Sequence, residues 1–198
     1  MKRNIYLIRH ARARMPAGNH FCIGLTDIPL DEEGKAQAEE FGKEFISNYG
    51  RLPVYCSYLK RSIQTARTIS DSPIVIDGLE EMFAGEWDGL SFDEIAARWP
   101  DLYAMRDSKP FLDPPGAETP EAAQERFFKA ILSVLSGSEG DIAVVAHSSV
   151  IQSFLCLVSG KEPGEAGSFK LKHCSVSTVC EEDGNFSLLS YNCGGYGF

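Results

Sequence analysis

Short β-rich runs alternate with helical patterns through the first part of the chain, and few folds are compatible with that alternation. Residues 4–9, 53–56 and 74–77 predict strands. Between them, Asp31 is placed to cap a helix that runs to about residue 49, and residues 59–70 predict a second helix. Because a βαβαβ series builds a largely parallel sheet with helices on both faces, we expect an α/β fold whose ligands bind at the carboxyl ends of the strands.

The rest of the chain is expected to hold four further helices, a buried strand and a hairpin. The helices are predicted at residues 91–99, 102–107, 120–135 and 148–158. The apolar run 142–146 predicts a buried strand, and the end of the chain predicts a hairpin of residues 175–180 and 186–191. We expect one domain over residues 1–198, with residues 83–120 as a cap or rim insertion.

Composition excludes several classes of protein. The 198 residues include 19 Lys and Arg against 28 Asp and Glu, a net charge of −9. This acidic balance disfavours nucleic-acid binding and attachment to anionic membranes, but a local basic cluster still permits a small phosphorylated substrate. No apolar run approaches the roughly 20 residues of a membrane span. The apolar run near the start of the sequence is too short for an export signal, which favours a cytoplasmic location. The six scattered cysteines form no zinc-ligand pattern and are expected to be reduced.

Arg and His side chains follow three of the predicted strands. Arg9 and His10 end the first, Arg61 lies in the helix that follows the second, and His147 comes directly after the buried strand 142–146. A neutral imidazole can attack phosphorus, and a guanidinium can hold two phosphate oxygens through its planar fork. Taken singly, each residue could equally be an ordinary surface or strand-end side chain with no role in a phosphate site. Together at one edge of a sheet, they indicate a phosphate site.

A carboxylic acid near this edge would supply the proton that a departing alkoxide needs. Glu81 follows the third strand, but neighbouring acidic residues compete for that role, namely Glu80, Glu86 and Asp88. From the residues alone, an exposed loop carboxylate is the ordinary interpretation of each.

Four segments, in order, resemble the motifs of the histidine phosphatase superfamily, in the branch that includes cofactor-dependent phosphoglycerate mutases and related small phosphatases. Residues 7–11 (Leu-Ile-Arg-His-Ala) resemble Leu-x-Arg-His-Gly, and residues 57–66 resemble Ser-Pro-Leu-x-Arg-Ala-x-Gln-Thr-Ala. Residues 144–148 resemble Val-Val-x-His-Gly, and the segment from Asp27 to Ala38 resembles the region after the first motif. The resemblance implies a three-layer α/β sandwich, with a central mostly parallel mixed sheet flanked by helices, as in phosphoglycerate mutase.

The resemblance also implies roles for the residues that match its motifs. His10 would become phosphorylated, and a phosphoryl group would be held by Arg9, Arg61, a cationic His147 and the backbone N–H of Ser148. Glu81, four residues before Gly85, falls on the proton donor, so the catalytic set is His10, Glu81 and His147. The scheme needs no metal and no cofactor. A substrate rim is expected from residues 12–26 and 83–120, with these rim candidates: Arg12, Arg14, His20, Ile23 and Gly24.

Departures from the pattern favour hydrolysis over phosphoryl transfer between substrates. Ile23 stands where the mutases often have Thr, and no basic insertion lies between Glu81 and His147. We therefore expect a metal-independent phosphatase for a small phosphorylated metabolite, with mutase-type transfer as the alternative. Residues 22–30 are most similar to enzymes described as α-ribazole phosphatases. The sequence gives no indication of oligomeric state.

Two other classes of function stay open. The same clamp would serve a binding module that holds a phosphorylated ligand without turnover, although His10 and Glu81 are both present. A metal hydrolase would use the four histidines, but no acidic ligand motif accompanies them: His10, His20, His147 and His173.

Overall fold

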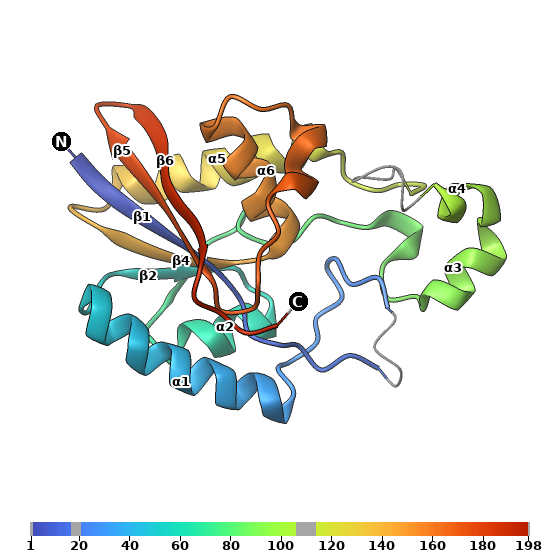
Figure 1. Cartoon of the computed structure of the whole chain (residues 1–198), viewed down its shortest axis with the longest axis horizontal. Coiled ribbons are helices and arrows are strands. Elements are labelled where there is room, and N and C mark those ends of the chain that lie inside the picture. The colour runs from blue at the N-terminus through green and yellow to red at the C-terminus, as the bar shows by residue number, and fades with distance from the viewer. Residues whose placement is uncertain (1, 17–20, 106–113, 198) are drawn as a thin grey trace.

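A six-stranded mixed sheet runs through the described part of this computed structural model, which covers residues 2–16, 21–105 and 114–197 (Figure 1). The strands lie in the order β3-β2-β4-β1-β5-β6. Their bounds are β1 (Lys2–Arg9), β2 (Val54–Cys56), β3 (Ile74–Val75), β4 (Ile142–Ala146), β5 (Val176–Glu182) and β6 (Asn185–Cys193).

Parallel pairing joins β3, β2, β4 and β1, while β5 and β6 are antiparallel to their neighbours. The predicted mostly parallel α/β sheet is therefore confirmed. The hairpin of β5 and β6 is confirmed as well, and its turn places Asp183 and Gly184 at φ 51° and 84°. Two consecutive left-handed residues match the right-handed twist of the flanking strands, which is why Asp-Gly suits this turn.

Helices cover both faces of the sheet. On one side lie α1 (Glu32–Tyr49) and α2 (Lys60–Ala66), and on the other lie α5 (Pro120–Ser136) and α6 (Ser148–Val158) (Figure 1). The remaining described helices are α3 (Phe92–Arg98), α4 (Pro100–Ala104) and two 3-10 turns, η1 (Gly85–Trp87) and η2 (Pro163–Ser168). Helix, sheet and helix form the three expected layers.

The central strand β4 shows how the sequence divides the core between these layers. All five of its side chains are buried. Val144 packs into the cluster that contains Phe127 of α5, whereas Val145 packs into the cluster that contains Phe41 of α1. Because successive side chains of a strand point to opposite faces, an unbroken apolar run is what a strand covered on both sides requires.

Two helix starts lie where the capping pattern places them. The Asp31 carboxylate accepts a hydrogen bond from Gly34 N at 2.6 Å, and the Thr119 hydroxyl accepts one from Ala122 N at 3.2 Å. Pro120 occupies the first turn of α5, where no intrahelical partner for an N–H is lost. Both starts are confirmed.

Three predicted boundaries are wrong. The second helix ends at Ala66 instead of residue 70, because the chain tightens there into 3-10 bonds such as Ile69 N to Ala66 O, at 3.0 Å. The third strand covers only Ile74–Val75 at the exposed edge of the sheet. The fourth helix begins at Pro100 instead of Leu102, since proline is well suited to a first helical position.

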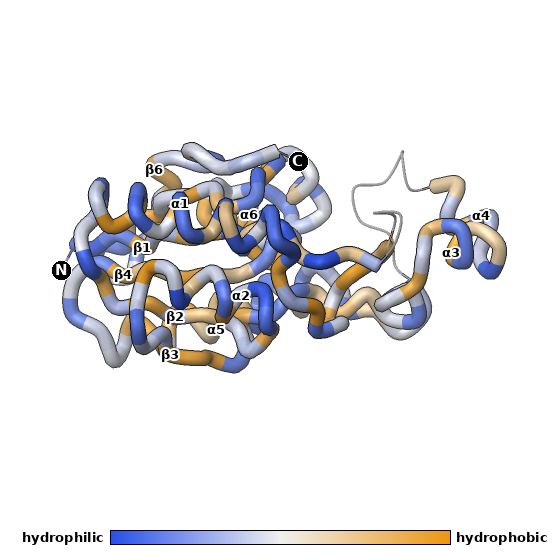
Figure 2. The backbone as a smooth tube through the Cα atoms, turned by 90° about the horizontal axis from the view of Figure 1, so that it is seen from below, coloured by the Kyte–Doolittle hydropathy of each residue, from blue (hydrophilic) through white to orange (hydrophobic). Residues whose placement is uncertain are grey.

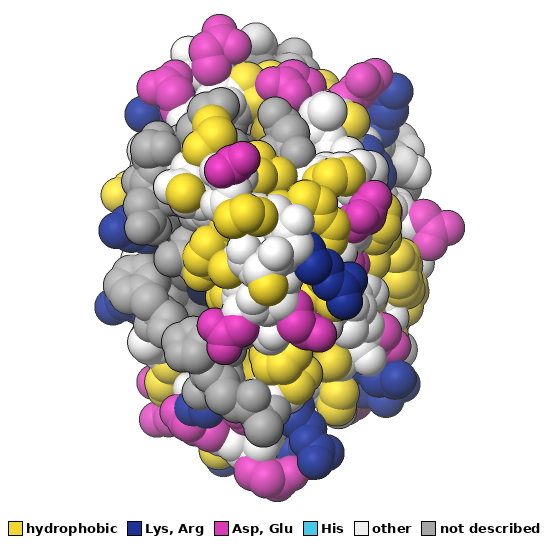
Figure 3. Space-filling model, turned by 90° about the vertical axis from the view of Figure 1, so that its right-hand side faces the viewer, with side chains coloured by type: hydrophobic (Ala, Val, Ile, Leu, Met, Phe, Trp, Pro, Cys, Tyr) yellow, Lys and Arg dark blue, Asp and Glu magenta, His cyan; other side chains and the backbone are white. Residues whose placement is uncertain are grey.

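Helices α3 and α4 lie at one end of the molecule, beyond the carboxyl ends of β1, β2 and β4 (Figures 1 and 2). Hydrophobic side chains gather on the face that this end presents, with acidic side chains around them (Figure 3). Aromatic pairs hold the region together, including Phe92 with Tyr103, whose ring centroids are 6.2 Å apart. Within the described ranges, no helix combines the length and apolar character that crossing a bilayer demands.

Candidate active site at the carboxyl edge of the sheet

The parallel pairing of β1 with β4 brings His10 and His147 together. Arg9 is paired with Ala146 in the register, so each strand ends immediately before one of the histidines. His10 N donates to Ala146 O at 3.0 Å, and the two imidazole centroids are 5.0 Å apart. The expectation that these strand ends meet at one edge therefore matches the geometry.

His10 is a buried, neutral imidazole with one nitrogen committed. The residue is 7% exposed, and Nδ1 lies 2.7 Å from the carbonyl oxygen of Ala11. Since a carbonyl only accepts, Nδ1 carries the proton and Nε2 keeps its lone pair. Burial holds the pKa of His10 well below its usual value, and the nearby positive charges of Arg61 and Arg9 act in the same direction. Such a ring is chemically able to act as a nucleophile at neutral pH.

His147 is also neutral, contrary to the cationic form that the family resemblance implied. It is completely buried, and burial together with Arg61 and Arg9 holds its pKa well below the ordinary value. Nε2 lies 2.7 Å from the hydroxyl oxygen of Ser57. Nδ1 is buried and has no hydrogen-bond partner among the described atoms. A buried ring nitrogen without a partner is unusual and suits a site that binds a further polar group.

Arg61 is held from behind by the main chain. The residue is 2% exposed, and its terminal nitrogens donate to Thr26 O at 2.9 Å and to Gly24 O at 2.7 Å. Burial lowers the pKa of Arg61, while Glu81 acts in the opposite direction. These carbonyls fix the orientation of the guanidinium.

Arg9 is fixed by the segment that leads into β5. One terminal nitrogen donates to Leu171 O, and the other donates to Nε2 of His173 at 3.0 Å. Its Nε is buried and has no partner among the described atoms. Burial lowers the pKa of Arg9, and the negative charge of Glu81 opposes that change. Two guanidinium groups therefore lie close to the paired histidines.

Glu81 lies against the start of α6, at the same edge as the histidines. The residue is 8% exposed. Its carboxylate accepts hydrogen bonds from Ser149 N at 3.1 Å, Val150 N at 3.2 Å and Met82 N at 2.9 Å. Free N–H groups at the start of a helix favour a carboxylate. Ser148, the first residue of α6, is half-buried beside His147.

The competing carboxylates have other partners or face solvent. Glu80 pairs with Arg126 at 3.1 Å, and Glu86 is exposed. Asp88 accepts four hydrogen bonds from residues 24–26, including one from Leu25 N at 2.6 Å. Of the four acidic candidates, Glu81 is the one that lies buried at the edge with the histidines.

The rim candidates have mixed surroundings. Arg12 pairs with Asp31 at 2.8 Å and with Glu33, so its charge is compensated. Arg14 is exposed, and Ile23 is half-buried. Gly24 is buried and contributes the carbonyl that holds Arg61, and a Cβ there would lie 2.5 Å from Met82 O. His20 lies outside the described residues.

The two predicted rim segments are joined to each other. Cys22 N donates to Leu90 O at 2.9 Å, and Gly89 N donates to Cys22 O at 2.8 Å. With the bonds from residues 24–26 to Asp88, these contacts tie the chain that supports Arg61 to the chain that follows Glu81.

His173 is the residue that the sequence analysis did not place in the phosphate site. Its ring centroid is 5.9 Å from that of His10, and burial with nearby Arg9 and Arg12 lowers its pKa to about 3. It borders a cavity of about 700 Å³ that Arg9 and Arg12 also line. The available signal was an antiparallel strand beginning near residue 175, because a strand antiparallel to β1 begins where β1 ends.

Among the described residues, no group of three or more His, Cys, Asp or Glu side chains is arranged to hold a metal ion.

Comparison with known proteins adds a family and several relatives. A model of the histidine phosphatase superfamily, branch 1, matches residues 5–194. The phosphatase PhoE of Bacillus subtilis, described as uncharacterized, is 29% identical over 177 residues, covering 86% of this chain and 85% of PhoE. A protein of Hydrogenobacter thermophilus with the provisional name phosphoserine phosphatase 2 is 31% identical over 197 residues, covering 97% of this chain and 96% of its own.

Solved structures agree on the fold. The α-ribazole phosphatase from Shigella flexneri superposes with a TM-score of 0.82 at 23% identity, covering 98% of each chain. At that identity, the likeness concerns the arrangement of the sheet and its helices.

Proposed function

Because the chain belongs to branch 1 of the histidine phosphatase superfamily and is a phosphatase, we propose that it hydrolyses small phosphomonoesters through a phosphohistidine on His10. The observation that carries this proposal is the buried, neutral His10, with Nδ1 directed at the Ala11 carbonyl and Nε2 available among cationic side chains. An imidazole fixed in this tautomer presents its lone pair without a prior loss of a proton.

In the first step, His10 Nε2 attacks phosphorus and the bond from phosphorus to the ester oxygen breaks. Arg9 and Arg61 oppose the charge on the phosphoryl oxygens. The partnerless Nδ1 of His147 and the N–H of Ser148 supply further donors to that group. We assign the tautomer in which Nε2 accepts from the Ser57 hydroxyl, so that a neutral His147 carries its proton on Nδ1 and donates without being cationic.

Glu81 moves the proton in both steps. As an acid it gives its proton to the departing alkoxide, and the free alcohol leaves. As a carboxylate it then takes a proton from water while the water oxygen attacks the phosphohistidine. The bond from phosphorus to nitrogen breaks, inorganic phosphate leaves, and His10 and Glu81 return to their starting states. The balance is one ester and one water consumed, and one alcohol and one phosphate formed.

The substrate side of the pocket is assigned to the described parts of residues 12–26 and 83–120, so that α3 and α4 act as a cap over the leaving group. Support comes from their place beyond the carboxyl ends of the strands (Figure 2) and from the hydrogen bonds that join the two segments. The names of relatives suggest a first panel of compounds: phosphoserine, α-ribazole phosphate and phosphoglycerate.

The test is hydrolysis of p-nitrophenyl phosphate in the presence of chelator by the wild type and by His10→Ala. Intact mass after acid quenching and after neutral quenching detects the phosphoryl adduct, which is labile in acid. We expect wild-type turnover, an adduct that requires His10, and an inactive variant with an unchanged melting temperature. Activity that collapses with chelator and returns with metal, or an active His10→Ala variant, would overturn the proposal. Phosphate binding without turnover on the whole panel would favour a binding module.

A further inference from the structure

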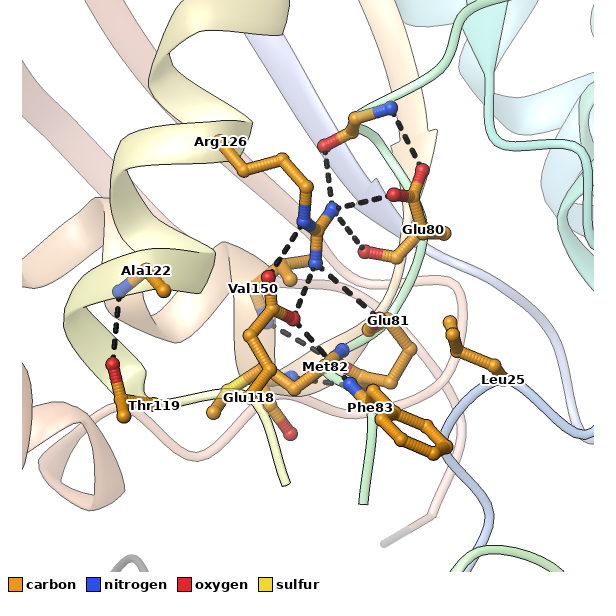
Figure 4. Close-up of polar contacts among 12 residues, drawn as sticks. Leu25, Glu80, Glu81, Met82, Phe83, Glu118, Thr119, Ala122, Arg126 and Val150 are labelled. Atoms are coloured by element: carbon orange, nitrogen blue, oxygen red, sulfur yellow. Dashed lines mark hydrogen bonds and ion pairs between the residues drawn. The ribbon is translucent and has the colours of Figure 1, made fainter. Parts of the chain in front are cut away.

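A single arginine of α5 holds the main chain that carries Glu81. Arg126 donates to the carbonyls of Gly78 at 2.9 Å, Glu80 at 3.2 Å and Glu81 at 3.4 Å (Figure 4). It also pairs with the Glu80 carboxylate at 3.1 Å. Most of the hydrogen-bonding capacity of this guanidinium is therefore committed to three residues of the segment that ends at Glu81.

Glu118 completes the arrangement from the segment that precedes α5. Its two carboxylate oxygens accept from Nε and one terminal nitrogen of Arg126, at 2.8 and 2.7 Å, in the two-pronged geometry that fixes both groups (Figure 4). Glu118 also meets the chain beyond Glu81, because Glu118 N donates to Phe83 O at 2.9 Å and Phe83 N donates to the carboxylate at 3.4 Å. The Arg126–Glu118 pair thus forms hydrogen bonds with the main chain on both sides of Glu81.

These contacts involve the main chain of Glu81, whereas its carboxylate contacts the start of α6. Ser149 N and Val150 N donate to its two oxygens. One helix therefore fixes the main chain of Glu81, and another orients its carboxylate. A proton donor needs that combination, because a displacement of about 1 Å is enough to slow proton transfer strongly.

The packing of α5 does not depend on the pair. Phe127, Ile131 and Val134 of the same helix are buried in the core beside Arg126. The loop also approaches α5 closely at Gly78, which has φ 95° and where a Cβ would lie 2.9 Å from the Ala130 methyl carbon. The loop and helix are therefore built to meet at this point.

Space next to Glu81 makes the pair necessary. Glu81, Glu118 and Arg126 all border one cavity of about 310 Å³, together with Leu25 and Phe83. Without the pair, the loop would have room to shift into this cavity.

We propose that Arg126 and Glu118 are positioning residues that hold Glu81 in place to protonate the leaving group. The inference rests on the proposed function, and it assigns a task to two residues outside the phosphate site. Loss of the pair is expected to impair the proton transfer and to spare the attack of His10.

The test compares two substrates that differ in their need for the proton. p-Nitrophenyl phosphate has a good leaving group, whereas phenyl phosphate has a poor one. We expect Arg126→Lys, which keeps the charge and loses the planar fork, to lower kcat on phenyl phosphate by about tenfold or more and on p-nitrophenyl phosphate by less than about threefold. Glu118→Gln, of similar volume, should show the same preference.

A matched control lies on the same helix. Glu125 and Lys129 form an exposed pair at 2.6 Å, and Lys129→Gln breaks it while the hydrogen bonds of Arg126 to Glu118 and to the Glu81 loop stay in place. This variant should keep the wild-type ratio of the two rates. Melting temperatures of all variants separate a shifted loop from a damaged fold.

A double-mutant cycle separates this inference from the function on which it rests. In a Glu81→Gln background, Arg126→Lys should cause little further loss, because the carboxyl group that Arg126 positions is already absent. Equal losses on both substrates, or losses that multiply with Glu81→Gln, would overturn the positioning role while the phosphatase mechanism stands. If Glu81→Gln itself shows no preference between substrates, the proton-donor assignment fails instead.

Discussion

Arg9 donates a hydrogen bond to Nε2 of His173 at 3.0 Å, across the junction where β1 ends and β5 approaches. The low pKa of His173 keeps that nitrogen an acceptor throughout the neutral range. One of the two proposed phosphate-binding guanidinium groups is therefore oriented by a residue far along the chain.

His173→Phe should weaken the grip on phosphate. The ring volume is nearly retained, but a buried terminal nitrogen of Arg9 loses its acceptor. We expect kcat/KM for p-nitrophenyl phosphate to fall by roughly 10- to 100-fold, the equivalent of about 1.5–3 kcal/mol for a hydrogen bond to a charged group. His173→Asn, which offers an amide oxygen, should recover part of the loss. An unchanged kcat/KM for His173→Phe would remove His173 from the site.

Arg61→Lys should lower kcat/KM strongly although it keeps the positive charge. An ammonium cannot satisfy Thr26 O and Gly24 O and hold two phosphoryl oxygens at once. We expect kcat/KM to fall by about 10²- to 10³-fold, as when a preorganised donor to a transition state is removed. The matched control is Lys60→Gln, an exposed neighbour paired with Asp27. A loss below about tenfold would place Arg61 outside the reaction.

Asp88→Asn should loosen the loop that supports Arg61. The carboxylate accepts four hydrogen bonds from residues 24–26. In Asn, an NH2 group replaces one carboxylate oxygen and would face N–H or O–H groups that need an acceptor. We expect the free energy of unfolding to fall by about 1–3 kcal/mol, and the KM for p-nitrophenyl phosphate to rise. Urea unfolding and steady-state kinetics measure the two effects. Glu86→Gln, exposed and two residues away, is the control and should change neither; a wild-type KM in Asp88→Asn would argue against this support.

Acid should destabilise the fold partly through His173. Its folded pKa of about 3 lies below the ordinary 6.5, so the unfolded chain binds more protons as the pH falls below 6.5. The free energy of unfolding then decreases by up to about 1.4 kcal/mol per pH unit through this histidine. Urea unfolding at about pH 7 and about pH 5 should show a smaller loss for His173→Asn than for the wild type. Identical losses would mean that the pKa of His173 is the same in the folded and the unfolded chain.

The sequence predicts those parts of the site that depend on parallel strand ends. Arg9, His10 and His147 follow strands whose apolar runs are easy to recognise, and neighbouring parallel strands bring their ends together. Arg61 follows from the same argument, because its helix starts at the end of β2.

Other features depend on contacts that no local pattern encodes. His173 reaches Arg9 only through the antiparallel pairing of β5 with β1. The bond between Arg126 and Glu118 depends on how the chain before α5 returns to the Glu81 loop. The neutral state of His147 follows from its complete burial beside cations. A match to a motif gives the residue type but does not describe the surroundings that set its charge.

The place of β1 in the sheet also determines when the protein can assemble. β1 is the first strand along the chain, yet its neighbours in the sheet are β4 and β5, both from the last third of the sequence. On the ribosome, His10 emerges before β4 and β5 and lacks these neighbours until the strand that ends at Glu182 has been synthesised. Such long-range pairing makes folding slow and leaves apolar strands exposed in the meantime. The site can therefore be completed only after β4 and β5 have been made.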